Sequence, residues 1–227
     1  MSDVNVHKNH RARMRERLFN SGAASFHDHE LLEMFLFMSD RRRDTNEMAH
    51  VLLDKFGSLK NVFTASPEQL CSICGIKEVA TANIQVVNEI MKRIEMESAK
   101  CPKSLESTDQ IGEYFVCKFK YTAVEEFYLM LLGSGMAIKD CILISRGDAH
   151  STRINVKNIL KEVVIHDASA VVIAHNHPDG ELMASNADVL MTRDIALALK
   201  NIDVELIDHI LVANNKYASI MHTRYNI

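Results

Sequence analysis

Residues 168–180 read Ala168-Ser169-Ala170-Val171-Val172-Ile173-Ala174-His175-Asn176-His177-Pro178-Asp179-Gly180. The first seven residues form a nearly continuous apolar run, which is typical of a central strand covered on both faces of its sheet. Two histidines follow directly, Pro178 stops the strand and Gly180 permits a tight turn. Because α/β folds place ligands where a strand ends in a loop, we expect a functional site at His175 and His177.

Strand-like and helix-like segments alternate around this stretch. Three segments have the length and composition of strands: residues 126–132, 140–145 and 204–212. Two segments have helical periodicity: residues 156–165 and 187–200. The mixture predicts an α/β domain over residues 105–227.

The first hundred residues have a different pattern, in which apolar residues recur at three- and four-residue intervals. This period predicts helices in the regions 30–38, 48–56 and 84–94. Gly57 stands where a helix C-terminal cap belongs, and Ser66-Pro67 is typical of a helix start. We therefore expect a helical domain over residues 1–100, joined to the second domain near residues 99–105, where Cys101-Pro102 breaks the pattern.

Composition excludes several classes of protein. The 227 residues are 47% hydrophobic and 25% charged, as in an ordinary globular protein, and the net charge of −4 provides no general attraction to nucleic acid. No apolar run approaches the roughly 18 residues that span a bilayer, and the start lacks a secretory signal. We expect a cytoplasmic protein with no membrane association, and its five cysteines are expected to be reduced. None of these features specifies an oligomeric state.

His175, His177 and Asp188 are three ligands suited to zinc with an open fourth position, where a water becomes a nucleophile near neutral pH. Residues i and i+2 of an extended segment point to one side, so both imidazoles can face one ion. Asp188 has a second explanation. Ser185 and Asp188 have capping-box spacing at the start of a helix, and their side chains can serve only that helix end.

The order His-x-His-Pro, followed by Ser and Asp at these offsets, resembles the JAMM (MPN-plus) metalloprotease motif, and His-Asn-His-Pro-x-Gly resembles its bacterial RadC-like branch. Further segments agree with that branch: Arg15-Glu16-Arg17-Leu18, Glu30-Leu31-Leu32, Phe56-Gly57-Ser58-Leu59, Glu125-Glu126-Phe127, Ala170-Val171-Val172-Ile173-Ala174 and Asp208-His209-Ile210. The resemblance covers roughly residues 10–225. It implies a helical, helix-hairpin-helix-like domain followed by a JAMM/MPN-like mixed-sheet zinc domain, related to the cytidine-deaminase-like architecture.

The resemblance implies three Zn²⁺ ligands: His175, His177 and Asp188. Glu125 matches the family's upstream glutamate, which activates the water, and Glu126 is the alternative base because neighbouring strand residues point in opposite directions. Ser185 matches the serine that stabilises the tetrahedral oxyanion. The implied reaction is hydrolysis of an amide or isopeptide bond in a peptide or protein substrate. Asp179 and the segment Val156-Lys157-Asn158-Ile159 depart from the family's usual residues, outside the ligand set.

Positive charge is concentrated in residues 7–17 and in Arg41-Arg42-Arg43. Such clusters can neutralise phosphates, and the candidates for nucleic-acid contacts are Arg11, Arg13, Arg15 and Lys77. A solvated arm and loop explain the same charges. Residues 70–80 resemble a helix-hairpin-helix, a DNA-backbone-binding element, but Lys77 or Glu78 replaces its second glycine, where backbone amides approach phosphate most easily.

Two functions from different classes follow. The first is a zinc-dependent hydrolase, a metallopeptidase or isopeptidase. The second is a DNA-associated repair or recombination accessory protein whose zinc is structural or inactive. A zinc deaminase is disfavoured because the His-x-Glu and Pro-Cys-x-x-Cys elements of that class are missing.

Overall fold

The computed structural model describes residues 9–40, 43–99, 102–147, 154–178 and 180–222. The chain separates into two compact units, Met1–Ile90 and Met91–Ile227. Among the described residues, every helix is too short or too polar to span a lipid bilayer.

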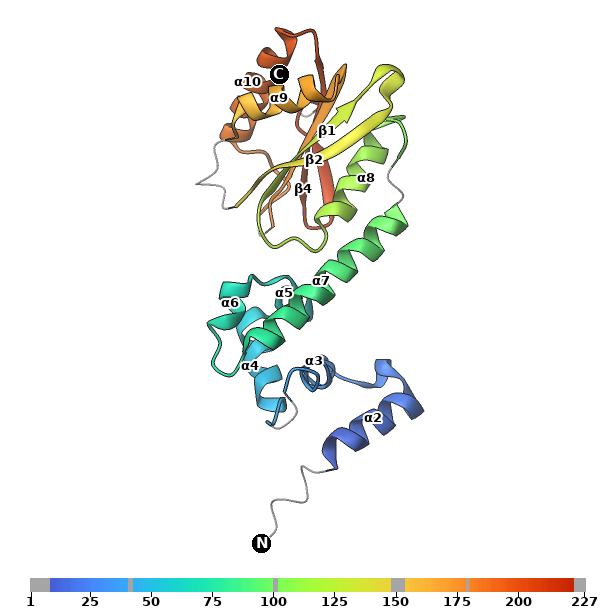
Figure 1. Cartoon of the computed structure of the whole chain (residues 1–227), viewed down its shortest axis with the longest axis vertical. Coiled ribbons are helices and arrows are strands. Elements are labelled where there is room, and N and C mark those ends of the chain that lie inside the picture. The colour runs from blue at the N-terminus through green and yellow to red at the C-terminus, as the bar shows by residue number, and fades with distance from the viewer. Residues whose placement is uncertain (1–8, 41–42, 100–101, 148–153, 179, 223–227) are drawn as a thin grey trace. The chain divides into compact units, whose positions relative to one another are not determined.

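The first unit is built from helices (Figure 1). They are α2 (His10–Ser21), the 3-10 helix η1 (Ala23–Ser25), α3 (Asp28–Leu36), α4 (Asn46–Phe56), α5 (Leu59–Thr64), α6 (Pro67–Cys71) and the first turns of α7 (Glu78–Ala99). Helices α3 to α7 each contribute buried side chains to one apolar core, among them Leu36, Leu52, Val62, Leu70 and Ile84. The predicted helical N-terminal region is confirmed.

The ends of these helices follow local sequence signals. Gly57 ends α4 with a φ of +79°, in the left-handed region that glycine adopts readily, and its N–H donates to the Leu53 carbonyl. Ser66 begins α6 by accepting a hydrogen bond from the Gln69 N–H, with Pro67 in the first turn. Both predicted helix ends are therefore confirmed.

The second unit contains a five-stranded mixed sheet with the order β2-β1-β3-β4-β5. The strands are β1 (Glu126–Leu132), β2 (Ile138–Arg146), β3 (Ala170–Asn176), β4 (Glu205–Ala213) and β5 (Lys216–Ser219). β3 and β4 are parallel, and the other neighbouring pairs are antiparallel. The predicted α/β class is confirmed. The four-residue β5 was not predicted because so short a segment has little periodicity.

Helices cover both faces of this sheet (Figure 1). On one face, α8 (Thr108–Phe119) packs Phe115 against Val172 of β3. On the other face, α9 (Val156–Ile165) and α10 (Asn186–Lys200) pack Ile159 and Ile195 against Ile173 of the same strand. Every residue of β3 is buried, as the continuous apolar run predicts. The helix α8 was missed, because its isoleucine, tyrosine, phenylalanine and valine favour strands and Gly112 weakens its helical signal.

The helix α7 runs unbroken past the point where the two units separate. Its last turns belong with the second unit, where Met96 packs on the core beneath α8 and Glu95 binds Lys120 at 2.8 Å. The two compact units divide after Ile90, inside this helix, and the predicted join near residues 99–105 follows the end of the same helix. Cys101 of the expected break lies outside the described residues.

Candidate metal centre

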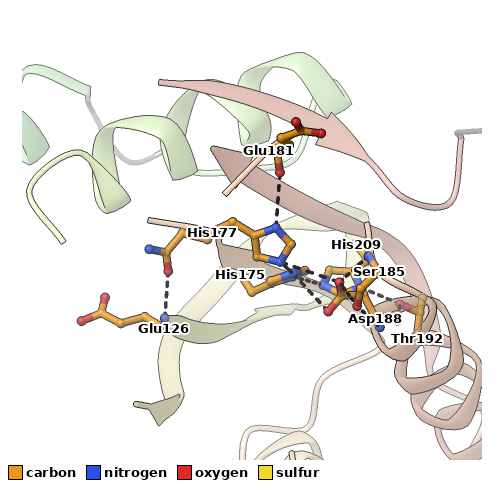
Figure 2. A network of polar contacts seen from close by, with 9 residues as sticks. Glu126, His175, His177, Glu181, Ser185, Asp188, Thr192 and His209 are labelled. Carbon is orange, nitrogen blue, oxygen red and sulfur yellow. Dashed lines mark hydrogen bonds and ion pairs between the residues drawn. The ribbon is translucent and has the colours of Figure 1, made fainter. Parts of the chain in front are cut away.

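The two histidines lie at the C-terminal end of β3. His175 is in the strand and buried, and His177 follows it, donating its backbone N–H to the Val212 carbonyl at 2.9 Å. Because the chain stays extended here, both side chains point to the same side of the backbone. Their Nε2 atoms lie 3.2 Å apart. Figure 2 shows the two rings converging on one place.

Asp188 stands in the first turn of α10, where its carboxylate makes two sets of contacts. Its Oδ2 accepts hydrogen bonds from the Ser185 N–H at 2.8 Å and the Ser185 hydroxyl at 2.7 Å. The Asp188 N–H in turn donates to Ser185 Oγ at 3.2 Å, which together with the Ser185 N–H bond forms a capping box. Its Oδ1 lies 3.3 Å from His175 Nε2, and Oδ2 lies 3.7 Å from His177 Nε2. The two explanations of Asp188 are therefore compatible, since the helix cap holds the carboxylate beside both histidines.

A small apolar cluster holds the loop that returns the chain from β3 to α10. It contains Leu182, Ala184, Val189, Leu211 and Ile220. At Gly180 a Cβ atom would lie 2.9 Å from His177 Cβ, so the turn beside the histidine leaves no room for a larger residue. The apolar cluster therefore holds Leu182 and Ala184 against Leu211 of β4, and Gly180 fits closely beside His177.

The adjacent glutamates Glu125 and Glu126 have different surroundings. Glu125 offers a carboxylate oxygen within 4.8 Å of ring nitrogens of His175 and His177. The Glu126 carboxylate is buried and accepts a hydrogen bond of 2.7 Å from Arg146 Nε. In Figure 2 it points away from the histidine rings. Glu125, unlike Glu126, therefore lies close enough to the histidines to accept a proton from a reactant held there or to join them as a ligand.

The donor atoms fit a tetrahedral metal site. The Nδ1 atom of His177 lies 3.3 Å from the Glu181 carbonyl oxygen, which only accepts, so Nδ1 is the donor of that contact and Nε2 is the nitrogen turned toward His175. Two ligand atoms bound at about 2.0–2.1 Å in tetrahedral geometry lie roughly 3.3 Å apart. The separations of 3.2 Å and 3.3 Å from His175 Nε2 match this value, whereas His177 Nε2 and Asp188 Oδ2 are 3.7 Å apart and would have to approach each other slightly.

Burial keeps the innermost histidines neutral. It lowers the pKa of His175 to about 4, against the opposing effect of the Asp188 carboxylate. It also lowers the pKa of His209 well below its ordinary value, and the neighbouring His175 and His177 act in the same direction. Neutral imidazole is the form that coordinates metals.

Two buried residues of the site were missed by sequence reasoning. His209 of β4 lies behind His175, with its Nε2 at 2.7 Å from His175 Nδ1, and Thr192 of α10 contacts the other nitrogen of His209 at 2.6 Å. A histidine inside an apolar strand and a threonine one helical turn after Asp188 were the available signals. Neither signal specifies the contact, because 34 residues separate the two histidines.

One of the four arginine and lysine candidates for nucleic-acid contacts, Arg11, instead makes contacts inside the first unit. Arg11 donates to the Arg43 carbonyl at 2.7 Å and lies over the Phe37 ring, while Arg13, Arg15 and Lys77 are exposed. Arg41 and Arg42 lie outside the described residues.

The predicted hairpin is formed by the end of α6, a turn and the start of α7. Ile73 and Ile76 are buried in the turn, and Gly75 has a φ of +94°, which glycine adopts without strain. Cys71 and Cys74 beside it are exposed free thiols, and they join no third metal-ligating side chain among the described residues.

Of the two departures from the family pattern, residues 156–159 form the first turn of α9, which Asn155 caps by accepting the Lys157 N–H at 3.0 Å. Asp179 lies outside the described residues.

Comparison with known proteins finds similarity along nearly the whole chain. A family model described as "RadC-like JAB domain" matches residues 105–225, and one described as "UPF0758 N-terminal" matches residues 7–82. A UPF0758 protein of Fusobacterium nucleatum is 32% identical over 219 residues, covering 93% of this chain and 94% of the relative. A UPF0758 protein of Shewanella loihica is 34% identical over 205 residues, covering 90% and 91%.

Proposed function

Because this chain belongs to the UPF0758 family and carries a RadC-like JAB domain, we propose that it is a zinc-dependent hydrolase of amide or isopeptide bonds in peptides or proteins. One observation carries this proposal. His175 Nε2, His177 Nε2 and the Asp188 carboxylate converge at 3.2–3.7 Å, with the Glu125 carboxylate beside them.

The donor set favours Zn²⁺ over other common ions. Two imidazole nitrogens suit a borderline-soft transition metal, whereas Mg²⁺ and Ca²⁺ prefer oxygen ligands. Three protein ligands leave one position of a tetrahedral site for a reactant, which is the arrangement of catalytic rather than structural zinc. His175, His177 and Asp188 are the residues that would hold the ion.

When bound, the ion supplies a Lewis acid that polarises the scissile carbonyl and lowers the pKa of a water molecule toward neutrality. Glu125 accepts a proton from the attacking water and delivers it to the leaving nitrogen. The water oxygen bonds to the carbonyl carbon and the C–N bond breaks, so the products are a carboxylic acid and an amine.

Ser185 has one hydroxyl hydrogen, which here is donated to Asp188 Oδ2 at 2.7 Å. To stabilise the developing oxyanion, this hydrogen must turn from the carboxylate toward the substrate. The Ser185 backbone N–H continues to hold Asp188 at 2.8 Å during that rotation. The proposed oxyanion role is therefore compatible with the helix cap.

Metal analysis of the purified protein tests the proposal. We expect about one zinc per chain, lost in His177→Ala and retained in the control His50→Ala, which removes an exposed histidine of α4. A mixture of fluorescence-quenched peptides then reports hydrolysis, which should stop on chelation and return with zinc. Absence of zinc from protein purified without chelators would refute the metal centre.

DNA association of the helical unit stays a prediction. The exposure of Arg13, Arg15 and Lys77 favours it, and the acidic Glu78 at the start of α7 opposes phosphate at the hairpin. Fluorescence anisotropy with a DNA duplex at several salt concentrations tests it. Phosphate contacts require an affinity that falls as salt rises, and the fall should be shallower in Arg13→Ala.

A further inference from the structure

A chain of buried polar groups extends from His175 away from the proposed metal position. His175 Nδ1 contacts His209 Nε2 at 2.7 Å, His209 Nδ1 contacts Thr192 Oγ1 at 2.6 Å, and Thr192 Oγ1 contacts the Asp188 carbonyl oxygen at 2.6 Å. His209 and Thr192 are both fully buried. The residues are seen together in Figure 2, with Thr192 and Asp188 on the same helix.

The position of each proton along this series of polar contacts follows from the last contact, between Thr192 and the Asp188 carbonyl oxygen. A carbonyl oxygen only accepts, and two oxygens at 2.6 Å need a proton between them, so the Thr192 hydroxyl donates to Asp188. Its single hydrogen is then used, and Thr192 Oγ1 can only accept from His209 Nδ1–H.

The same reasoning assigns the ring protons of His209 and then of His175. No carboxylate of the described residues contacts the His209 ring, which is fully buried, and burying an unpaired charge is costly. The ring is therefore neutral and has one N–H. Its Nε2 therefore accepts, and His175 Nδ1–H is the donor. The remaining nitrogen of His175, Nε2, keeps its lone pair beside His177 and Asp188.

We propose that His209 is a positioning residue that, together with Thr192, holds His175 in the Nδ1–H tautomer, so that Nε2 presents a lone pair to the metal position. The opposite tautomer would place a proton on Nε2, where the ion must bind. The benefit for metal binding rests on the proposed function, but the tautomer itself belongs to the metal-free protein and is measurable there.

The surrounding strands, helix and aromatic ring enclose these polar contacts and keep solvent away from them. β3 and β4 pair in parallel with Ile173 opposite His209, which places His209 on the same face as His175. The Phe127 ring stacks on His175 with centroids 6.4 Å apart and meets His209 edge-on at 5.8 Å. Thr192 follows Asp188 by one helical turn, so α10 positions both the Asp188 carboxylate and the Thr192 hydroxyl that contacts His209.

Imidazole ¹⁵N chemical shifts of the metal-free protein at pH 8 test the tautomer directly. We expect Nδ1–H at His175 in the native protein and in Thr192→Ser. In the isosteric Thr192→Val the acceptor for His209 Nδ1–H is lost, so His209 should turn to Nε2–H and His175 should shift toward Nε2–H. An Nε2–H tautomer at His175 in the native protein, or no change in a folded Thr192→Val, would overturn the proposal.

Zinc affinity, measured by competition with a chelator, tests the consequence. Loss of a hydrogen-bond partner behind a ligating histidine typically weakens metal binding about 10–100-fold, and we expect this range for Thr192→Val and His209→Phe. Thr192→Ser should restore the native affinity. If the native protein binds no zinc, the proposed function fails while the ¹⁵N measurement still decides the tautomer. Equal affinity in all variants would overturn the role of His209 in metal binding.

Discussion

Glu125 and Glu126 are neighbours in the chain, yet their carboxylates have separate surroundings. Glu125 offers an oxygen within 4.8 Å of ring nitrogens of His175 and His177, whereas Glu126 is held by Arg146 at 2.7 Å. Strand geometry causes the difference, because successive side chains point to opposite faces. The pair is therefore a matched test of which carboxylate acts as the base.

Glu125→Gln should lower the rate of peptide hydrolysis by about 10²–10⁴, the usual contribution of a general base, while the zinc content stays the same. Glu126→Gln is the control, with the same chemical change one residue away. It should keep the rate and lose about 1–3 kcal/mol of stability, because glutamine keeps an oxygen for Arg146 but removes the charge of the buried carboxylate. The opposite pattern of rates would assign the base to Glu126.

The two roles of Asp188 can be separated by substitution. Asp188→Asn keeps an oxygen that can accept from the Ser185 N–H but loses the carboxylate charge, so zinc affinity should fall by more than the ~10–100-fold typical of an outer hydrogen-bond partner. Ser185→Ala removes the cap and should cost about 1 kcal/mol while zinc is retained. Isothermal titration with zinc and thermal unfolding of both variants measure these effects. Comparable zinc affinity in Asp188→Asn and the native protein would limit Asp188 to capping.

The stability of the metal-free protein should depend on pH through His175. Its pKa is about 4 in the folded protein and ordinarily 6.5, so between these values the unfolded chain binds more protons. The free energy of unfolding therefore rises with pH. The contribution is fully present above about pH 6.5 and lost as the pH falls to about 4. At ~1.4 kcal/mol for each unit of pKa, it amounts to roughly 3 kcal/mol.

Urea unfolding followed by circular dichroism from pH 4.5 to 8 measures this dependence. The His175→Asn variant should have a shallower pH profile than the native protein, because it lacks the titrating imidazole. Identical profiles for the two proteins would show that His175 titrates alike in the folded and unfolded states.

Gly112→Ala should destabilise the second unit, although alanine normally favours a helix by about 1 kcal/mol. The added Cβ would lie 2.4 Å from the Tyr217 ring, whose hydroxyl is tied to Asp109 at 2.6 Å. Overpacking of this kind costs about 1–3 kcal/mol. Thermal unfolding should show the loss, and it should vanish when Tyr217→Ala removes the ring. Unchanged stability of the single variant would mean that the ring moves aside freely.

Local sequence signals predicted much of this fold. The strand β1 and the helix α9 begin and end where apolar periodicity places them, and the apolar run before His175 became the fully buried β3. Helix α8 escaped detection because its aromatic and β-branched residues favour strands in isolation, whereas in the fold Phe115 and Ile111 pack on the sheet and Ser107 caps the helix.

The sequence by itself determined the residue types of the proposed metal site, the extended spacing that turns His175 and His177 to one side, and the helix start that carries Asp188. Those features depend on neighbours within a few residues. The tertiary structure alone decided that Glu125 faces the histidines and that His209 and Thr192 stand behind His175. The pairing of β3 with β4 brings together histidines 34 residues apart, and no local propensity encodes a contact at that separation.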